Sequence, residues 1–315
     1  MYQYRKFELN LGDNLSSGNI LQQISCNLCG SQKSQTLSYS KNYPDRIVGN
    51  VVRCTGCGLV YRNYHPKYDS SPSHNQQTYH RQDYPAKCTE GRLGMFNDYL
   101  ARVSRYRKYN RILDVGSGQG FFLKLCSDKG WEVYGVDINP ELVEFTANEL
   151  GIKIFNGSLE QAQYEENFFD VVTFWNVLDH LIKPDKALKE AYRILRPGGA
   201  VFLRVPNGVF HVACRRIFSN LYKLWKGIKS FDHSVIYLYS FNRITISRYL
   251  RKAGFQYPVL KNGEPTWLHE GSRKLCMQKM IGASAKGCAE IVKIVSRGHC
   301  LIGPSLLATA IKPIQ

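Results

Sequence analysis

Long apolar runs are absent from this chain of 315 residues. No uninterrupted stretch approaches the roughly 20 apolar residues that span a bilayer, which argues against a membrane-spanning protein. The first ten residues lack an apolar run behind the basic pair Arg5-Lys6, so we expect no secretory leader. Internal repeats and low-complexity tracts are missing as well, which excludes a repeat architecture. We therefore expect a cytoplasmic globular protein.

Acidic side chains are scarce. The chain holds 25 Asp and Glu against 42 Lys and Arg, which gives a formal charge of +17. The imbalance is largest between residues 204 and 315, where 18 basic residues face 4 acidic ones. A one-sided basic field attracts anions, so the candidates are a phosphorylated or nucleotide-linked substrate, nucleic acid, or an acidic membrane surface. A solvated surface that aids solubility is the alternative.

Cysteine is too rare and too unevenly placed for a disulfide scaffold, with 10 residues in the whole chain. Two C-x-x-C turns stand out, Cys26-Asn-Leu-Cys29 and Cys54-Thr-Gly-Cys57, and a glycine follows each. Two such turns complete a tetrahedral Cys₄ site, so Cys26, Cys29, Cys54 and Cys57 are predicted zinc ligands. Because four thiolates leave no open coordination position, this zinc should be structural. Free or redox-active thiols are the alternative.

The chain divides into predicted segments of different composition. Residues 1–25 form a loose polar arm, residues 26–61 the zinc ribbon, and residues 62–91 a linker or lid. Residues 92–315 form the main domain, which opens with an amphipathic helix. Between 211 and 231 apolar and basic positions recur at helical spacing, which predicts an inserted basic helix. That helix could cap the substrate, lie on a membrane surface or cover the core, and we favour the cap.

Short β-branched and aromatic runs alternate with helical stretches from Arg111 onward. Parallel strands need crossover connections, so this alternation predicts an α/β fold with a doubly wound, mostly parallel, Rossmann-like sheet of seven strands. The predicted strands are 112–115, 132–136, 153–155, 170–174, 200–205, 255–261 and 305–312, and the helices between and after them are 121–129, 140–150, 184–195 and 244–253.

A glycine-rich loop, Asp114-Val-Gly-Ser-Gly-Gln-Gly120, follows the first predicted strand and opens a helix. Such a loop lets the backbone approach a nucleotide cofactor at a helix N-terminus. Asp137, which ends the second strand, is placed to accept hydrogen bonds from two ribose hydroxyls. An NAD-dependent oxidoreductase is the closest competing use of this loop, but in its G-x-G-x-x-G fingerprint the third glycine comes one residue later.

These residues resemble the class I S-adenosylmethionine-dependent methyltransferases. The resemblance rests on Arg111–Gly120 together with Val136-Asp-Ile-Asn-Pro140, Phe169-Asp-Val-Val172, Val177-Leu-Asp-His180 and Leu195-Arg-Pro-Gly-Gly199. It implies that S-adenosylmethionine is the cofactor. It also implies that the methionine end of the cofactor is lined by Asp114, Gly116, Ser117, Gly118 and Gly120.

The same resemblance assigns the rest of the cofactor site. Asp137 would hold the ribose and Ile138 would cover the adenine, while Asn176 is a further cofactor-binding candidate. Ser158 and Leu159 would contact the adenine edge, although the family pattern usually shows Asp where this chain has Ser158.

A zinc ribbon joined to such a domain resembles a bacterial subgroup that includes methyltransferases of deoxysugars and other small metabolites. The matching positions are the four cysteines, Leu59-Val-Tyr61 and Tyr237-Leu-Tyr-Ser-Phe241. The resemblance implies a small-molecule acceptor, a sugar or a nucleotide-linked or other anionic metabolite. A nucleic-acid methyltransferase or binding module is the alternative, motivated by the ribbon and the basic charge. Against it, residues 175–180 lack a Pro-Pro-Tyr signature and the chain lacks a Pro-Cys pair.

A hydroxyl or acidic carbon acceptor must lose a proton, so a base is expected beside it. His180 follows the fourth strand at the edge where ligands of such sheets bind, which makes it the predicted catalytic base. The alternative is a histidine that caps a helix or orients a loop, and His211 and His233 are weaker base candidates. An ordinary histidine titrates near neutrality, so turnover should fall as the pH drops through that range.

Overall fold

The computed structural model describes residues 21–38, 50–66, 90–212, 238–263 and 300–314, together with a few single residues between 287 and 296. Most of the predicted arm 1–25, linker 62–91 and basic helix 211–231 therefore lies outside the described residues, as does His233.

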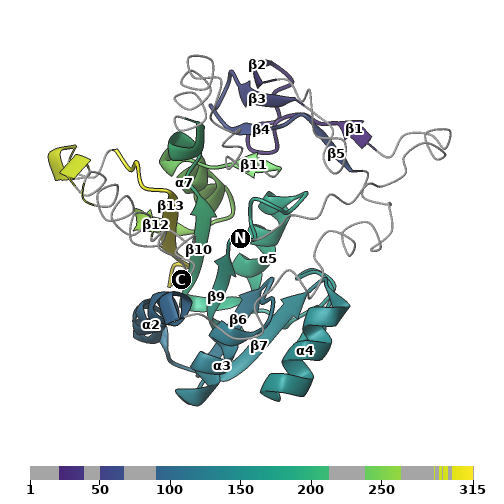
Figure 1. The fold of residues 1–315 in the computed structure, drawn as a ribbon, viewed down its shortest axis with the longest axis vertical. Coiled ribbons are helices and arrows are strands. Elements are labelled where there is room, and N and C mark those ends of the chain that lie inside the picture. The colour runs from purple at the N-terminus through teal and green to yellow at the C-terminus, as the bar shows by residue number, and fades with distance from the viewer. Residues whose placement is uncertain are drawn as a thin grey trace, which may run out of the picture.

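A seven-stranded sheet forms the centre of the molecule (Figure 1). Its strands are β6 (Arg111–Val115), β7 (Glu132–Asp137), β8 (Phe155–Asn156), β9 (Phe169–Trp175), β10 (Leu195–Pro206), β12 (Gln256–Gly263) and β13 (Ser305–Ile311). Their order is β12-β13-β10-β9-β6-β7-β8. Only β13 runs antiparallel to its neighbours, and the other pairs are parallel. The predicted α/β class and mostly parallel seven-stranded sheet are confirmed.

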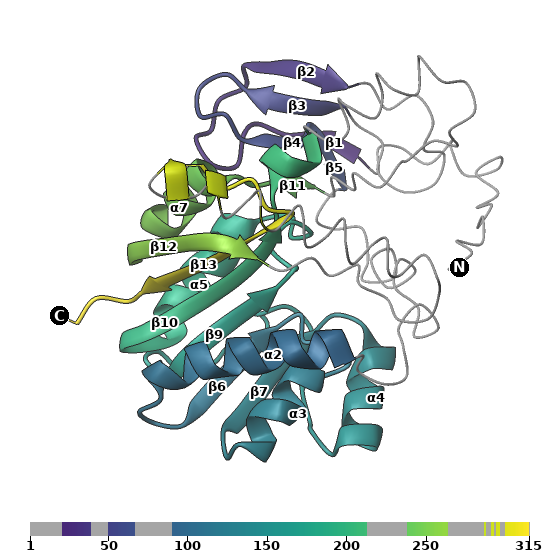
Figure 2. The same cartoon turned by 60° about the vertical axis from the view of Figure 1, so that its left-hand side comes forward.

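Helices cover both faces of this sheet (Figure 2). They are α2 (Glu90–Val103), α3 (Phe121–Asp128), α4 (Pro140–Leu150), α5 (Pro184–Ile194) and α7 (Arg243–Lys252). Successive strand residues serve opposite faces, so Ile112 packs with α2 and α3, while Leu113 shares the core of α5 and α7. This two-sided burial explains why the strands read as continuous apolar runs. No helix of the described residues is long and apolar enough to cross a membrane.

Local capping sets two of the helix ends. Asn139 accepts the backbone N–H of Glu141 at 2.9 Å, which fixes the start of α4, and Gly151 ends it at φ +67°. In α7, Asn242 and Thr245 bond reciprocally in a capping box.

The paired cysteines lie at the end of, and in the turns beside, a smaller four-stranded sheet with the order β11-β4-β3-β2. Its members are β2 (Ser34–Ser38), β3 (Val51–Cys54), β4 (Val60–Arg62) and β11 (Tyr239–Ser240), and a separate pair joins β1 (Leu21–Gln23) to β5 (Tyr64–Pro66). Strand β11 comes from the region just before α7 and pairs with β4 through Tyr239↔Tyr61. Leu28, Leu59 and Tyr61 share one hydrophobic core with α7. The segment from β1 to β5 with its two C-x-x-C turns, called the cysteine unit below, therefore packs directly against the main domain.

Candidate functional site

The carboxyl ends of β6 and β9 meet at the point where the strand order changes direction. From β6 the chain builds outward through β7 to β8, and it then returns to place β9 on the other side of β6. Open α/β sheets bind ligands at such a switch point. The structure brings several predicted residues to this edge, namely Asp114, the glycine loop 116–120, Asp137, Asn176 and His180.

The three glycines of the loop serve different purposes. Gly116, at φ +67°, packs so closely that an added Cβ would lie 2.5 Å from Cγ2 of Val177. Gly120, at φ +70°, would place a Cβ 2.7 Å from Cγ2 of Thr146. At Gly118 an added Cβ would meet nothing within 4 Å. The chain's own packing requires two of the glycines, and the third leaves open space for a ligand to approach the backbone.

Asp137 ties the glycine loop to the end of β7. Its Oδ2 accepts the N–H of Gly118 at 2.8 Å, and its Oδ1 accepts the N–H of Asn139 at 2.9 Å. Burial raises the pKa of Asp137, and the bonds from these N–H groups oppose the rise. Each oxygen keeps a further lone pair, so the carboxylate can still accept from a diol. Ile138 beside it is 44% exposed and offers an apolar surface to a flat base.

Asp114 lies beneath the loop, 2% exposed, and its Oδ1 accepts the hydroxyl of Thr173 at 2.6 Å. Burial raises the pKa of Asp114 to about 8, the charge of Asp137 adds to the rise, and Arg92 opposes it. Near neutral pH this carboxyl is therefore largely protonated. The sequence motif alone did not indicate this.

The buried carboxyl of Asp114 should make folding stability depend on pH. Between the unfolded pKa of about 3.9 and the folded value the native state binds the additional proton, so its contribution is full below pH 4 and is lost as pH rises toward 8. Asp114→Asn should flatten that fall by up to about 1.4 kcal/mol per pH unit. Urea unfolding at pH 5 to 8 checks this, with the exposed Asp128→Asn as control. Parallel curves for wild type and Asp114→Asn would contradict the assignment.

The residues predicted to contact the adenine edge, Ser158 and Leu159, make contacts with other residues of the chain. The Ser158 N–H donates to Oε1 of Gln161 at 2.8 Å, and its hydroxyl accepts the Gln161 N–H at 3.3 Å. Leu159 is 2% exposed and packs in the main core. The hydroxyl of Ser117 is buried without a hydrogen-bond partner among the described residues. Contacts of these three residues with a cofactor remain predictions.

Arg204 lies 3% exposed in β10, and no sequence motif predicted it as a site residue. Asn176, at φ +59°, donates its N–H to the Arg204 carbonyl at 2.8 Å, and the Arg204 guanidinium donates to Oδ1 of Asn176. The available signal was a single charge inside the apolar run Val201-Phe-Leu-Arg-Val205. Arginine side chains are almost never fully buried unless they are paired.

His180 lies in the turn after β9, with Nε2 3.7 Å from Oδ2 of Asp179. Burial lowers the pKa of His180 to about 4 and raises the pKa of Asp179 to about 7. The expected titration near neutrality was therefore wrong, because desolvation disfavours the imidazolium. The imidazole is neutral at physiological pH and able to accept a proton. In His211, Nε2 instead lies 3.0 Å from the Pro304 carbonyl oxygen, so this nitrogen donates a hydrogen bond to that carbonyl.

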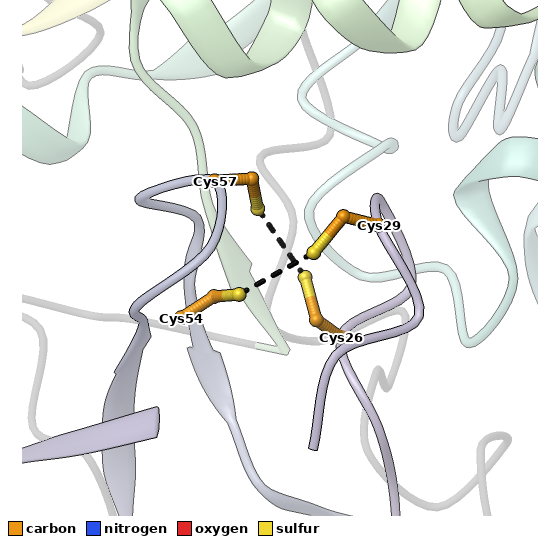
Figure 3. Close-up of side chains that lie close together, drawn as sticks. All are labelled: Cys26, Cys29, Cys54 and Cys57. Carbon is orange, nitrogen blue, oxygen red and sulfur yellow. Dashed lines mark hydrogen bonds between the residues drawn. The ribbon is translucent and has the colours of Figure 1, made fainter. Parts of the chain in front are cut away.

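The four predicted metal ligands point toward one another from two turns (Figure 3). Their sulfurs lie within 4.8 Å of one another, with Cys26 to Cys57 and Cys29 to Cys54 each at 3.5 Å. These separations exceed a disulfide bond of about 2.05 Å and approach the edge of about 3.8 Å that Zn–S bonds of about 2.3 Å require. Backbone N–H groups of Leu28 and Cys29 face the Cys26 sulfur. The cluster fits a tetrahedral metal ion.

The chain matches a family model and curated relatives that are methyltransferases. A family model described as a methyltransferase domain matches residues 80–258. A ubiquinone biosynthesis O-methyltransferase of Alkalilimnicola ehrlichii is 30% identical over 116 residues, which cover 35% of this chain and 47% of the relative. A probable S-adenosylmethionine-dependent methyltransferase of Mycolicibacterium smegmatis is 29% identical over 99 residues, 31% of this chain and 38% of the relative. The chain thus spans less than half the length of these relatives.

Among solved structures, a SAM dependent methyltransferase from Archaeoglobus fulgidus aligns with a TM-score of 0.45 and 20% identity, covering 69% of this chain and 94% of that one.

Proposed function

We propose that this chain, which belongs to the methyltransferase domain family, transfers a methyl group from S-adenosylmethionine to a small-molecule acceptor. The observation that supports this most directly is the glycine loop at the switch point. There Gly118 is open to a ligand and Asp137 holds the loop beside an exposed Ile138. A nucleoside needs these three features, namely an approachable backbone, a diol acceptor and an apolar face.

The residues divide the work of the reaction. S-adenosylmethionine, when bound, supplies a methyl group already activated on a sulfonium. Asp137 would accept the ribose hydroxyls, and Ile138 would exclude water from the base. Alignment of acceptor and donor is the main demand on the protein. His180, neutral and next to Asp179, would take the acceptor proton.

The acceptor we propose is a sugar or a nucleotide-linked or other anionic metabolite. The net charge of +17 favours an anion, and the ubiquinone biosynthesis relative is named for a small-molecule pathway. We further propose that residues 26–61 act as a structural zinc ribbon, that residues 92–315 form the catalytic domain, and that the helix predicted from the sequence at 211–231 caps the acceptor. Paired thiols with metal-site spacing are typical of a reducing compartment, so we propose a cytoplasmic enzyme.

A nucleic-acid substrate is the second candidate. The observation that favours it is a surface groove of about 570 Å³ between α7 and β12, lined by Arg243, Arg248 and Arg251. An electrophoretic shift with RNA or DNA that weakens steeply with salt would support this candidate. The absence of a shift, together with a mass gain of about 14 daltons on a small metabolite, one CH₂ group, would support the first.

Removal of the Asp137 carboxylate should weaken cofactor binding. Asp137→Ala loses charge-assisted bonds to the ribose and frees the Gly118 N–H, so S-adenosylhomocysteine affinity should fall about 10- to 150-fold. Calorimetric titration measures this. Glu132→Ala, at the exposed far end of the same strand, should bind as wild type does. Equal affinity of Asp137→Ala and wild type would remove Asp137 from the site.

A further inference from the structure

Arg204 lies level with the start of the glycine loop. The last paired residues of β6 and β9 are Val115 and Phe174, and one step further Trp175 pairs with Arg204. Side chains alternate along β10, so Arg204 shares a face with Phe202, the face covered by α2. Trp175 packs on the same face, and Tyr99 of α2 stacks on it with ring centroids 4.4 Å apart. Arg204 and Trp175 therefore stand side by side at the ligand edge.

Both groups only donate hydrogen bonds. The Arg204 guanidinium carries five N–H donors and no acceptor, and the indole of Trp175 carries one donor. The indole N–H is buried with no hydrogen-bond partner among the described residues. A cluster of buried donors suits a ligand that only accepts, which an anion does.

The groups around Arg204 act on its pKa in both directions. Its guanidinium donates to the neutral Asn176 and hydrogen-bonds Tyr99, while burial and the nearby Arg92 lower the pKa of Arg204. Asp179 and Tyr99 act in the opposite sense. Burial raises the pKa of Asp179 to about 7, so near neutral pH this carboxyl carries only part of a charge. Burial of a guanidinium is costly, and an anion bound at this edge of the sheet would offset part of that cost.

We propose that Arg204, with the indole N–H of Trp175 beside it, binds a carboxylate or phosphate group of the methyl acceptor. The planar fork of a guanidinium matches both groups with two parallel hydrogen bonds. This places the acceptor between the glycine loop and the His180 turn, with its anionic end on β10. The inference rests on the proposed methyl transfer, and the carboxylate of S-adenosylmethionine is the competing source of the same chemistry.

Inorganic phosphate is a suitable probe. Wild-type protein saturated with S-adenosylhomocysteine should bind phosphate in a calorimetric titration at ionic strength held constant with chloride. Arg204→Met should weaken this binding by at least about tenfold, because a charge-assisted pair is lost. Arg248→Met, in the surface groove of α7, should leave it unchanged. S-adenosylhomocysteine is first titrated into each protein by itself, and phosphate is titrated both with and without it, so a failure of the proposed function is recognised separately.

A second variant guards against misfolding of Arg204→Met. Asn176→Asp supplies a carboxylate beside the guanidinium at a backbone φ of +59° that Asp tolerates, so the fold should persist while phosphate binding is lost. Phosphate binding that survives in both variants would overturn the proposal. So would phosphate binding that S-adenosylhomocysteine abolishes, since the anion would then occupy the cofactor's own site.

Discussion

Alanine at position 180 should slow methyl transfer by about 10²- to 10⁴-fold while S-adenosylhomocysteine affinity stays nearly unchanged. His180 follows β9 at the edge where the glycine loop opens, and its imidazole is neutral because burial lowers its pKa to about 4. In its ionised form Asp179, with Oδ2 3.7 Å from Nε2, favours the imidazolium that would form when a proton is taken up. The rate is measured by single-turnover kinetics with an acceptor that the wild-type protein methylates.

The pH profile separates a base from a merely structural histidine. With a pKa near 4, His180 should cause no loss of rate between pH 8 and about pH 5 in the wild type. His211→Ala is the matched control: it loses a bond to the Pro304 carbonyl, so it should lower stability more than rate. A near-normal turnover of His180→Ala, or a combined loss of rate and cofactor affinity, would exclude the catalytic role of His180.

The substitution Cys54→Ser should abolish metal binding and disorder the turn that carries His180. Freshly purified wild type should hold about one zinc per chain by elemental analysis, because four converging thiolates bind zinc with about 10–16 kcal/mol in small domains. Cys54→Ser should lose that zinc, and Cys300→Ser, an exposed cysteine away from the cluster, should keep it. The metal assignment would be refuted if elemental analysis found no zinc in freshly purified wild-type protein.

The coupling to the turn follows from the hydrogen bonds. Strand β4 follows Cys57 and pairs with β11, and the N–H groups of Leu238 and Tyr239 donate to the Asp179 carbonyl at 3.1 and 3.2 Å. Loss of metal should therefore lower turnover more than cofactor affinity and speed amide exchange at residues 238–240. Unchanged turnover in zinc-free protein would show that the cysteine unit is independent of the site.

Local patterns explain what was predictable here. A strand, a glycine loop and a helix are consecutive in the chain, so Gly116–Gly120 and Asp137 could be placed from spacing and periodicity alone. Each C-x-x-C turn likewise carries its own geometry within four residues, and the two turns do meet. The edge strand β8 was less well anticipated. It covers Phe155–Asn156 and is exposed, whereas a strand at 153–155 was expected, because only one neighbour fixes its register.

Other features depend on contacts between distant segments. Asn27 of the cysteine unit bonds Asp185, 158 residues away, and Tyr249, 222 residues away, which no local pattern reveals. The packing of Gly116 against Val177, the pKa values of Asp114 and His180, and the burial of Arg204 arise in the same way. Periodicity reports what neighbouring residues do to the backbone. Desolvation and counter-charge depend on which strands lie side by side. The glycine loop was therefore predictable from the amino-acid order, while the protonation states of Asp114 and His180 were settled only when β6, β9 and β10 came together.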